Sequence, residues 1–173
     1  MCNVYFAFVY SFNIIFLMVK IDKVYTRGGD SGKTSLGDGS RVAKTDKIIV
    51  ALAHIEELNA NLGYVINKLP SEYINTFSKI QNDLFDLGAD IITPTTKKDS
   101  LRINKKYIIT LEKEIDKILS SLPSLKSFIL PGGTEISSRI HVTRTVCRRC
   151  EIAILELNKK KAVNSEILKY INR

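Results

Sequence analysis

The sequence predicts an all-α protein built as an antiparallel helix bundle, and three observations support this fold class. Apolar residues recur at intervals of three and four along four long segments, which places each set on one face of a helix. Proline-containing breaks at 69–71, 93–95 and 130–133 separate these segments. The 173 residues, of which 45% are apolar and 25% charged, suffice for one domain with a sizeable core.

Each predicted helix follows from one apolar series. The four long series run, in order, over 48–69, 73–91, 108–122 and 136–157. Ser71, which Glu72 follows, is the expected N-cap of the second helix. A fifth helix begins near Asn164 and has room for about two turns, which are marginally stable alone. We therefore expect four full helices and a truncated fifth one, packed as an antiparallel bundle.

The first residues differ from the rest of the chain. Residues 2–19 carry no charge and approach the length of a membrane span, but they lack the basic start and the cleavage site of a signal peptide. They are a signal anchor, a buried or disordered extension, or a segment outside the working protein. Because Met18 begins a run that looks like a natural start, we favour the last reading: an apolar extension over 1–17 and a single domain over 18–173. We expect a cytoplasmic protein, with a membrane attachment only if residues 1–17 belong to it.

The charge balance indicates an anionic partner. Lys and Arg number 26 against 18 for Asp and Glu, which gives a net charge of +8. A basic helical module for nucleic acid is disfavoured, because the basic residues are not interleaved with aromatic ones. The three cysteines, an odd number, argue against a secreted disulfide scaffold.

Residues 25–44, here called the glycine loop, have the composition of a phosphate-binding segment. Glycines let backbone N–H groups approach an anion closely, and the Thr, Ser, Lys and Arg side chains add donors. The run Gly32-Lys33-Thr34 is not a P-loop, because that pattern needs a glycine where Arg27 stands. A solvated loop without a ligand stays open as the alternative.

A polar stripe runs along the fourth predicted helix, within an arc of about 80°. It consists of Ser137, His141, Arg144, Arg148 and Glu151. The stripe borders the apolar face, and arginines at such an edge need a carboxylate or phosphate partner. The planar guanidinium suits phosphate oxygens, while ion pairing between subunits is the alternative. By itself, His141 is more often structural than catalytic.

Two further residue pairs have structural interpretations. Cys147 and Cys150 have C-x-x-C spacing, but both lie on the apolar face and no other Cys or His pair completes a zinc site. We expect core cysteines and no metal site. Glu56 and Glu57 have no second acidic cluster to work with, so a surface or salt-bridge role is expected.

Seven motifs, in order and with short spacings, resemble the PduO-type ATP:cob(I)alamin adenosyltransferases. They are YTRGGDSGKTSL, RVAK, EELNANLG, IQNDLFDLGADI, FILPGG, HVTRTVCRRCE and YINR. The resemblance covers about residues 20–173, and FILPGG followed by the H-x-x-R-x-x-x-R-R-x-E run is its most specific part. It implies a five-helix bundle with ferritin-like left-handed packing that forms a homotrimer, with ATP sites between subunits.

The resemblance also assigns residues to the site. On the loop side of ATP it implies Thr26, Arg27, Gly28, Gly29, Asp30, Thr34, Ser35 and Lys44. On the helix side, from the neighbouring subunit, it implies Arg148, Arg149, Cys150, Glu151, Ile152 and Asn172. It implies catalytic roles for Arg148, for Glu56 paired with Arg144 across the interface, and for Phe128, which lies at the lower face of the corrinoid and excludes its nitrogen ligand. Glu56 replaces the usual Asp, and Ile152 replaces a final arginine.

The implied reaction moves the 5′-deoxyadenosyl group of ATP to the cobalt of cob(I)alamin, releases triphosphate and gives adenosylcobalamin. Because the nucleophile is the reduced cobalt of the substrate, the protein needs no Ser–His or Cys–His pair. Mg²⁺ is the implied cofactor, and a cobalamin reductase and an adenosylcobalamin-dependent enzyme are the implied partners. The alternative is a catalytically impaired, truncated homologue that binds ATP or cobalamin without turnover.

Overall fold

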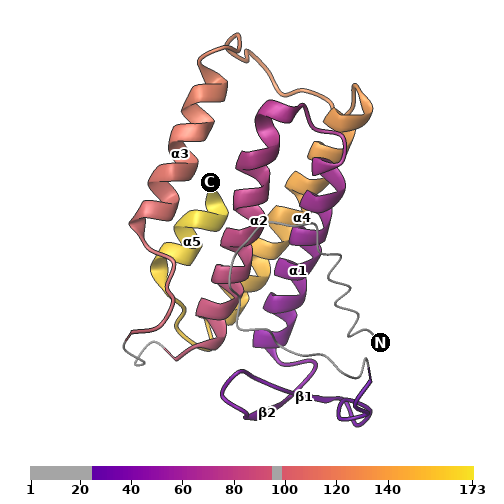
Figure 1. The fold of residues 1–173 in the computed structure, drawn as a ribbon, viewed down its shortest axis with the longest axis vertical. Helices are drawn as coiled ribbons and strands as arrows, with labels where there is room; N and C mark the ends of the chain where they lie inside the picture. Colours follow the sequence, from indigo (N-terminus) through magenta and orange to yellow (C-terminus); the bar gives the residue numbers. More distant parts are fainter. Residues whose placement is uncertain (1–24, 95–98) are drawn as a thin grey trace.

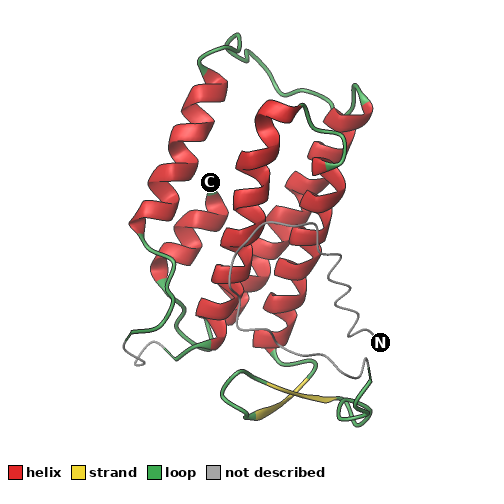
Figure 2. Ribbon diagram, in the orientation of Figure 1, coloured by secondary structure: helices red, strands yellow, loops and turns green. Residues whose placement is uncertain are grey.

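The structure, a computed structural model, describes residues 25–94 and 99–173. The expectations for residues 1–17 and for a start at Met18 lie outside these ranges. The elements are β1 (Lys33–Ser35), β2 (Arg41–Ala43), α1 (Lys47–Ile66), α2 (Ser71–Ile92), α3 (Lys105–Leu119), α4 (Glu135–Asn158) and α5 (Ser165–Asn172). Figure 1 shows the helices as a bundle with the two strands at one end of it, and Figure 2 shows how far helices dominate the chain. Within the described ranges, no helix has the length and apolar character needed to cross a membrane.

The five predicted helices are confirmed, and side-chain caps define where most of them begin. Asp46 accepts a hydrogen bond from the backbone N–H of Ile48 at the start of α1, over 2.9 Å. Thr134 caps α4 and Asn164 caps α5 in the same way. Such caps satisfy backbone donors that have no partner within the helix.

The prediction that Ser71 caps the second helix is wrong. The N-cap position of α2 is Pro70, which makes no side-chain cap, and Ser71 is already the first helical residue. The carbonyl oxygen of Pro70 accepts the N–H of Tyr73 over 3.0 Å, so the first turn closes on the proline backbone. Glu72 lies in that turn, where its negative charge interacts favourably with the positive end of the helix dipole.

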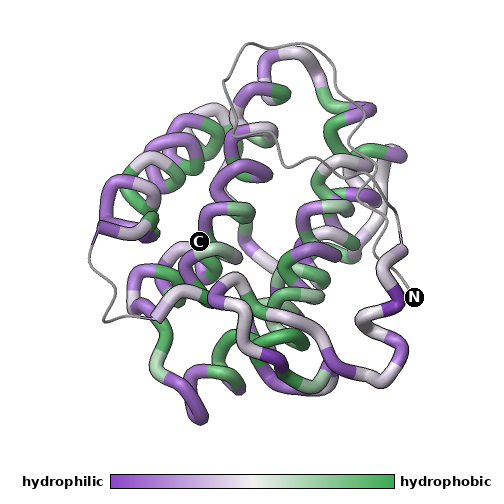
Figure 3. Tube along the Cα trace, turned by 60° about the horizontal axis from the view of Figure 1, so that its bottom comes forward, coloured by the Kyte–Doolittle hydropathy of each residue, from purple (hydrophilic) through white to green (hydrophobic). Residues whose placement is uncertain are grey.

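The core lies between α1, α2 and α4, with α5 packed against α4 and α3. Its most buried large side chains are Leu84, Leu87, Ile103, Ile154 and Ile167. Figure 3 shows hydrophobic positions recurring along the helices between hydrophilic ones, as the apolar series predicted. Cys150 is 0% exposed and Cys147 packs against the same core, which confirms the two as core cysteines. Burial raises the pKa of the Cys150 thiol to about 12.

The short hairpin at 33–43 was not predicted from the sequence. Its strands are antiparallel, with Thr34 opposite Val42. The connecting turn closes when the N–H of Leu36 donates to the carbonyl of Ser40 over 2.8 Å, and Gly39 takes a φ of 83° that favours glycine. Three-residue strands are too short for an alternation of apolar and polar residues to be visible. The glycines and serines around them are typical of a loop, so the sequence did not indicate strands here.

Candidate functional site

Arg41 holds the glycine loop in place. From β2, its Nη2 donates to the carbonyl oxygen of Gly28 over 2.5 Å, and its Nη1 donates to the hydroxyl of Ser35 over 3.3 Å. The guanidinium therefore joins the start of the loop to the end of β1. Within the RVAK motif, only Lys44 was expected from the sequence to bind the nucleotide. The fork geometry of arginine, which can join two acceptors at once, was the signal available for Arg41.

Lys44 lies directly over the loop backbone. A Cβ atom added at Gly29 would lie 2.8 Å from the Nζ of Lys44, so a larger residue there would displace the end of the lysine side chain. The N–H of Lys44 donates to the carbonyl of Gly32 over 2.8 Å, and Arg27 has a left-handed φ of 58°. Thr26, Arg27 and Asp30 are exposed, and Thr34 is half-buried on β1. The loop thus presents a cation and a tightly turned backbone on an open surface, as an anion site requires.

The polar stripe predicted on the fourth helix lies on α4. Arg144 and Arg148 are exposed, while Ser137, His141 and Glu151 are half-buried. Asn172, at the end of α5, donates from its Nδ2 to the Oε1 of Glu151 over 2.9 Å. The structure therefore brings together two residues that were predicted to bind the nucleotide and that are 21 positions apart in the chain.

Arg149 is directed to α1. Its Nη2 forms an ion pair and hydrogen bond with Oε1 of Glu57, and the Nδ1 of His54 lies 3.5 Å from the other oxygen of that carboxylate. The hydrogen bond from Arg149 lowers the pKa of Glu57. The salt-bridge role expected for Glu57 is thereby confirmed, although both side chains are exposed and such pairs contribute little stability. The side chains of successive helical residues point about 100° apart, so Arg148 and Arg149 point in different directions.

The remaining helix-side candidates differ in accessibility. Ile152 and Arg144 are exposed on α4, and Glu56 is exposed on α1. The Glu56–Arg144 pair is expected between subunits. The structure of one chain does not test it, so it stays a prediction. Cys150 is fully buried in the core, so its side chain is not accessible to a nucleotide and does not enter the site proposed below.

Phe128 lies on the loop before α4 and is fully exposed at 106%. Its neighbours Ile129 and Leu130 are also exposed. The loop is held to α4 where the hydroxyl of Ser137 donates to the carbonyl of Gly132 over 2.8 Å. The following residue, Gly133, has a φ of 103° that only glycine readily adopts. This loop therefore presents apolar side chains at the surface.

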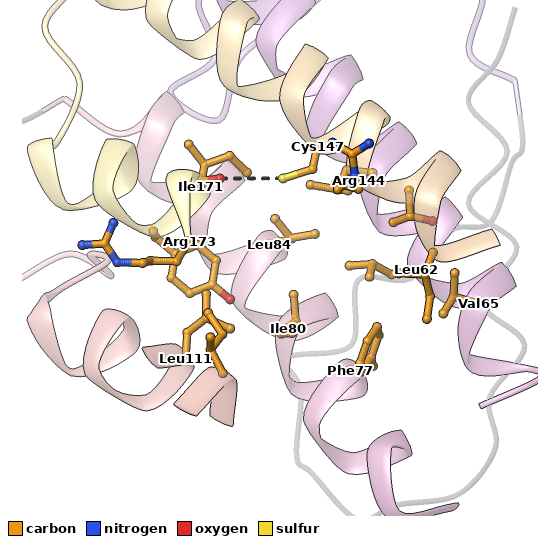
Figure 4. Close-up of a pocket in the computed structure, with 15 residues that line it drawn as sticks. Leu62, Val65, Phe77, Ile80, Leu84, Leu111, Arg144, Cys147, Ile171 and Arg173 are labelled. Carbon is orange, nitrogen blue, oxygen red and sulfur yellow. Dashed lines mark hydrogen bonds between the residues drawn. The ribbon is translucent and has the colours of Figure 1, made fainter. Parts of the chain in front are cut away.

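Two hollows accompany these residues. A groove of about 620 Å³ between α1 and α2 is lined in part by Glu56, Asn59, Gln81 and Phe85. A second, almost wholly apolar cavity of about 230 Å³ lies among all five helices, with Arg144 and Arg173 among its lining residues (Figure 4). Its walls suit hydrocarbon and not a triphosphate.

The described residues contain no group of three or more His, Cys, Asp or Glu side chains arranged to hold a metal ion. Mg²⁺ commonly binds through substrate phosphates and water with few protein ligands. The cations and hydroxyls of the glycine loop fit a phosphate chain that carries its own Mg²⁺, so no protein ligand is assigned to the metal.

Comparisons with known proteins agree on one family. A family model described as cobalamin adenosyltransferase matches residues 24–173. The corrinoid adenosyltransferase of Mycobacterium tuberculosis is 46% identical over 140 residues, covering 78% of this chain and 72% of the relative. The cobalamin adenosyltransferase of Cupriavidus metallidurans is 38% identical over 156 residues, covering 89% and 83%.

Solved structures give the same result. A variant of the PduO-type ATP:corrinoid adenosyltransferase from Lactobacillus reuteri, complexed with cobalamin and ATP, superposes with a TM-score of 0.81. It is 34% identical, and the match covers 87% of this chain and 86% of that one. The all-α bundle predicted from the sequence is therefore the fold of its relatives. On the sequence match and the fold together, the chain belongs to the cobalamin adenosyltransferase family.

Proposed function

We propose that this protein is an ATP:corrinoid adenosyltransferase, which transfers the 5′-deoxyadenosyl group of ATP to the reduced cobalt of cob(I)alamin and releases triphosphate. One observation carries the proposal: the family match at 24–173 spans both the glycine loop and the α4–α5 residues. A relative named for this activity is 46% identical, and a related structure holds cobalamin and ATP.

The protein's part in the reaction is positioning and charge stabilisation. The cobalt of the substrate attacks C5′, so the chain has to align C5′ with cobalt and stabilise the negative charge on the departing triphosphate. We assign the phosphate oxygens to Lys44 and the turned backbone of the glycine loop, with Thr26, Arg27, Asp30, Thr34 and Ser35 beside them. We assign the same task to Arg148 from the other half of the site, with Glu151 and Asn172 holding the nucleoside end. Mg²⁺ neutralises part of the phosphate charge when it is bound.

We propose that the two halves of the site come from different copies of the chain, in a homotrimer. Glu56 is exposed beside the groove between α1 and α2, and Arg144 is exposed on α4, so both side chains of the expected pair, which have opposite charge, lie on the surface of one chain. The exposed Phe85, 61% accessible in one chain, would be covered by such a contact. Analytical ultracentrifugation of the full chain tests this assembly, and a monomer at micromolar concentration would contradict it.

We assign the corrinoid to the loop that carries Phe128. An apolar side chain against the lower face of the corrinoid offers no ligand to cobalt and disfavours the bound nitrogen base. Loss of that base makes cobalt(II) easier to reduce to the nucleophile. The exposure of Phe128, Ile129 and Leu130 supports this assignment.

An anaerobic spectrophotometric assay tests the function. We expect chemically reduced cobalamin and Mg-ATP to be converted to adenosylcobalamin and triphosphate by the full chain. Binding of ATP or cobalamin in calorimetry without any product would instead identify an impaired homologue. Absence of both binding and product would overturn the proposal.

We also propose that the working protein starts at Met18 and acts in the cytoplasm. Intact-mass measurement of the native protein tests the start, because a chain from Met1 would retain the uncharged residues 2–19. Fractionation of the cells tests the location, and recovery in the membrane fraction would contradict it.

Replacing Arg41 with alanine is expected to raise the KM for ATP about tenfold, with a smaller change in kcat. The variant loses hydrogen bonds to Gly28 and Ser35, which order the loop before the nucleotide arrives. A hydrogen bond to a charged group contributes about 1.5–3 kcal/mol, and the lower end of that range corresponds to slightly more than a tenfold effect. Steady-state kinetics at varied ATP measures it. Lys113→Ala, which removes an exposed positive charge from α3, is the control. An unchanged KM in Arg41→Ala would show that the loop needs no such support.

A further inference from the structure

The short helix α5 depends on other elements for its position. It has eight residues, and helices of this length are marginally stable by themselves. At its start, the Oδ1 of Asn164 caps the helix by accepting the N–H of Glu166 over 3.0 Å. The Nδ2 of the same residue donates to Oδ2 of Asp90 over 2.8 Å, and to the carbonyl of Ile103 over 2.7 Å. The first turn of α5 is therefore attached to α2.

The last turn of α5 is attached to α2 by a second buried carboxylate. The hydroxyl of Tyr170 donates to Oδ2 of Asp83 over 3.1 Å, and Tyr170 is only 3% exposed. Asp83 also accepts from the Nζ of Lys79, at 2.7 and 2.9 Å, so its charge is balanced. Burial, followed by the charge of Asp83, raises the pKa of Tyr170, so the hydroxyl keeps the proton that it donates.

The position of Tyr170 determines the position of Asn172. Residues two apart on a helix point in nearly opposite directions, so Tyr170 points into the bundle while the exposed Asn172 reaches Glu151 on α4. Between them, the carbonyl of Ile171 lies 3.7 Å from the Sγ of Cys147, which Figure 4 shows as the dashed line between α5 and α4. A rotation of α5 would therefore move Asn172 away from Glu151.

We propose that Tyr170, through its hydrogen bond to Asp83, is a positioning residue for nucleotide binding, because it fixes the rotation of α5 that places Asn172 beside Glu151. The inference rests on the proposed function, since Asn172 and Glu151 are assigned there to the nucleoside end of ATP. Tyr170 itself touches no substrate. Its effect is on the affinity for ATP, and the chemical step proceeds once ATP is bound.

A matched pair of tyrosines allows a sharp test. Tyr107 on α3 also donates to a carboxylate of α2, the Oδ2 of Asp86 over 2.9 Å, and its ring meets that of Tyr170 edge-on, with centroids 6.4 Å apart. Tyr107→Phe and Tyr170→Phe each remove one hydroxyl from the same cluster, but only Tyr170 lies on α5. We expect Tyr170→Phe to raise the KM and Kd for ATP about fivefold or more, with kcat changed less than about twofold. For Tyr107→Phe we expect both constants to stay near those of the wild type.

Kinetics at varied ATP and calorimetry with ATP supply the measurements, and thermal unfolding of both variants monitors the fold. Asp83→Asn keeps an acceptor for the hydroxyl, so its KM is expected to lie closer to the wild-type value than that of Tyr170→Phe. Equal KM and Kd in Tyr170→Phe and the wild type would overturn the inference, as would equal increases in the two tyrosine variants. A wild-type chain that binds ATP without turnover still permits the comparison of Kd values. A wild-type chain that binds no ATP would overturn the proposed function and this inference together.

Discussion

Replacing Arg148 with alanine is expected to lower kcat for adenosyl transfer by two to three orders of magnitude. Removing one preorganised donor from a site of charge development typically costs about 10²–10³ in rate. Arg148 is exposed on α4, within one turn of Glu151, and Glu151 is joined to Asn172. Its guanidinium is therefore free to reach the triphosphate that, in the assembly we propose, the glycine loop of another copy would hold. The anaerobic assay with saturating ATP measures the loss.

Two further variants separate the loss of the Arg148 guanidinium from a general loss of positive charge. Lys159→Ala removes a positive charge from the C-cap of the same helix, at an exposed position paired with Glu156, and is expected to leave kcat unchanged. Arg148→Lys keeps the charge but loses the planar fork, and an intermediate rate is expected. Near-wild-type turnover in Arg148→Ala would remove Arg148 from the catalytic group.

Replacing Asp90 with alanine is expected to lower the free energy of unfolding by about 3 kcal/mol. The carboxylate is 2% exposed. Its Oδ1 accepts from Nη1 of Arg102 over 2.5 Å, and its Oδ2 accepts from the backbone N–H of Ile103 and from Asn164, each over 2.8 Å. Breaking a buried pair by removing one partner costs about 3–5 kcal/mol. The lower end applies because Arg102 keeps a hydrogen bond to the carbonyl of Thr93.

Urea unfolding measures this loss, and the exposed Asp116→Ala on α3 is the control. Surface substitutions of that kind usually stay within about 0.5 kcal/mol. Because Asp90 joins the end of α2, the segment before α3 and the start of α5, unfolding of Asp90→Ala is also expected to begin in α5. Equal stability of Asp90→Ala and the wild type would mean that packing alone holds these elements.

The helices were predictable because their apolar series record directly which residues face the core. Ile48, Ile55 and Leu62 follow the helical spacing, and all three are buried. The hairpin was not predictable, because β1 and β2 each have three residues and are held by turn hydrogen bonds and by Arg41. The prediction for Ser71 was wrong because the N-cap position depends on the backbone geometry of a single residue, and the type of side chain only suggests that geometry.

The candidate site was partly predictable for a related reason. Residue types with strong chemistry, such as the glycines at 28–29 and the arginines of α4, are visible in the sequence. Which arginine points where is not, because the direction depends on helix rotation and on partners from distant segments. Arg149 meets Glu57, 92 positions away, and Arg41 meets Gly28. Cys150 was expected both in the core and at the nucleotide, and the burial of its side chain confirms the first of these expectations.

The way in which Arg41 holds the glycine loop has an electrostatic consequence. Both of its acceptors, the Gly28 carbonyl and the Ser35 hydroxyl, are uncharged, so they order the guanidinium without neutralising it. Residues 25–44 contain four basic and two acidic side chains, so this end of the bundle keeps a surplus of positive potential. The first encounter with a nucleotide is therefore a long-range attraction that grows with the number of phosphates. Dissolved salt screens this attraction over distances of about 8–10 Å. ATP is attracted more strongly than AMP or adenosine before any contact with the base is made.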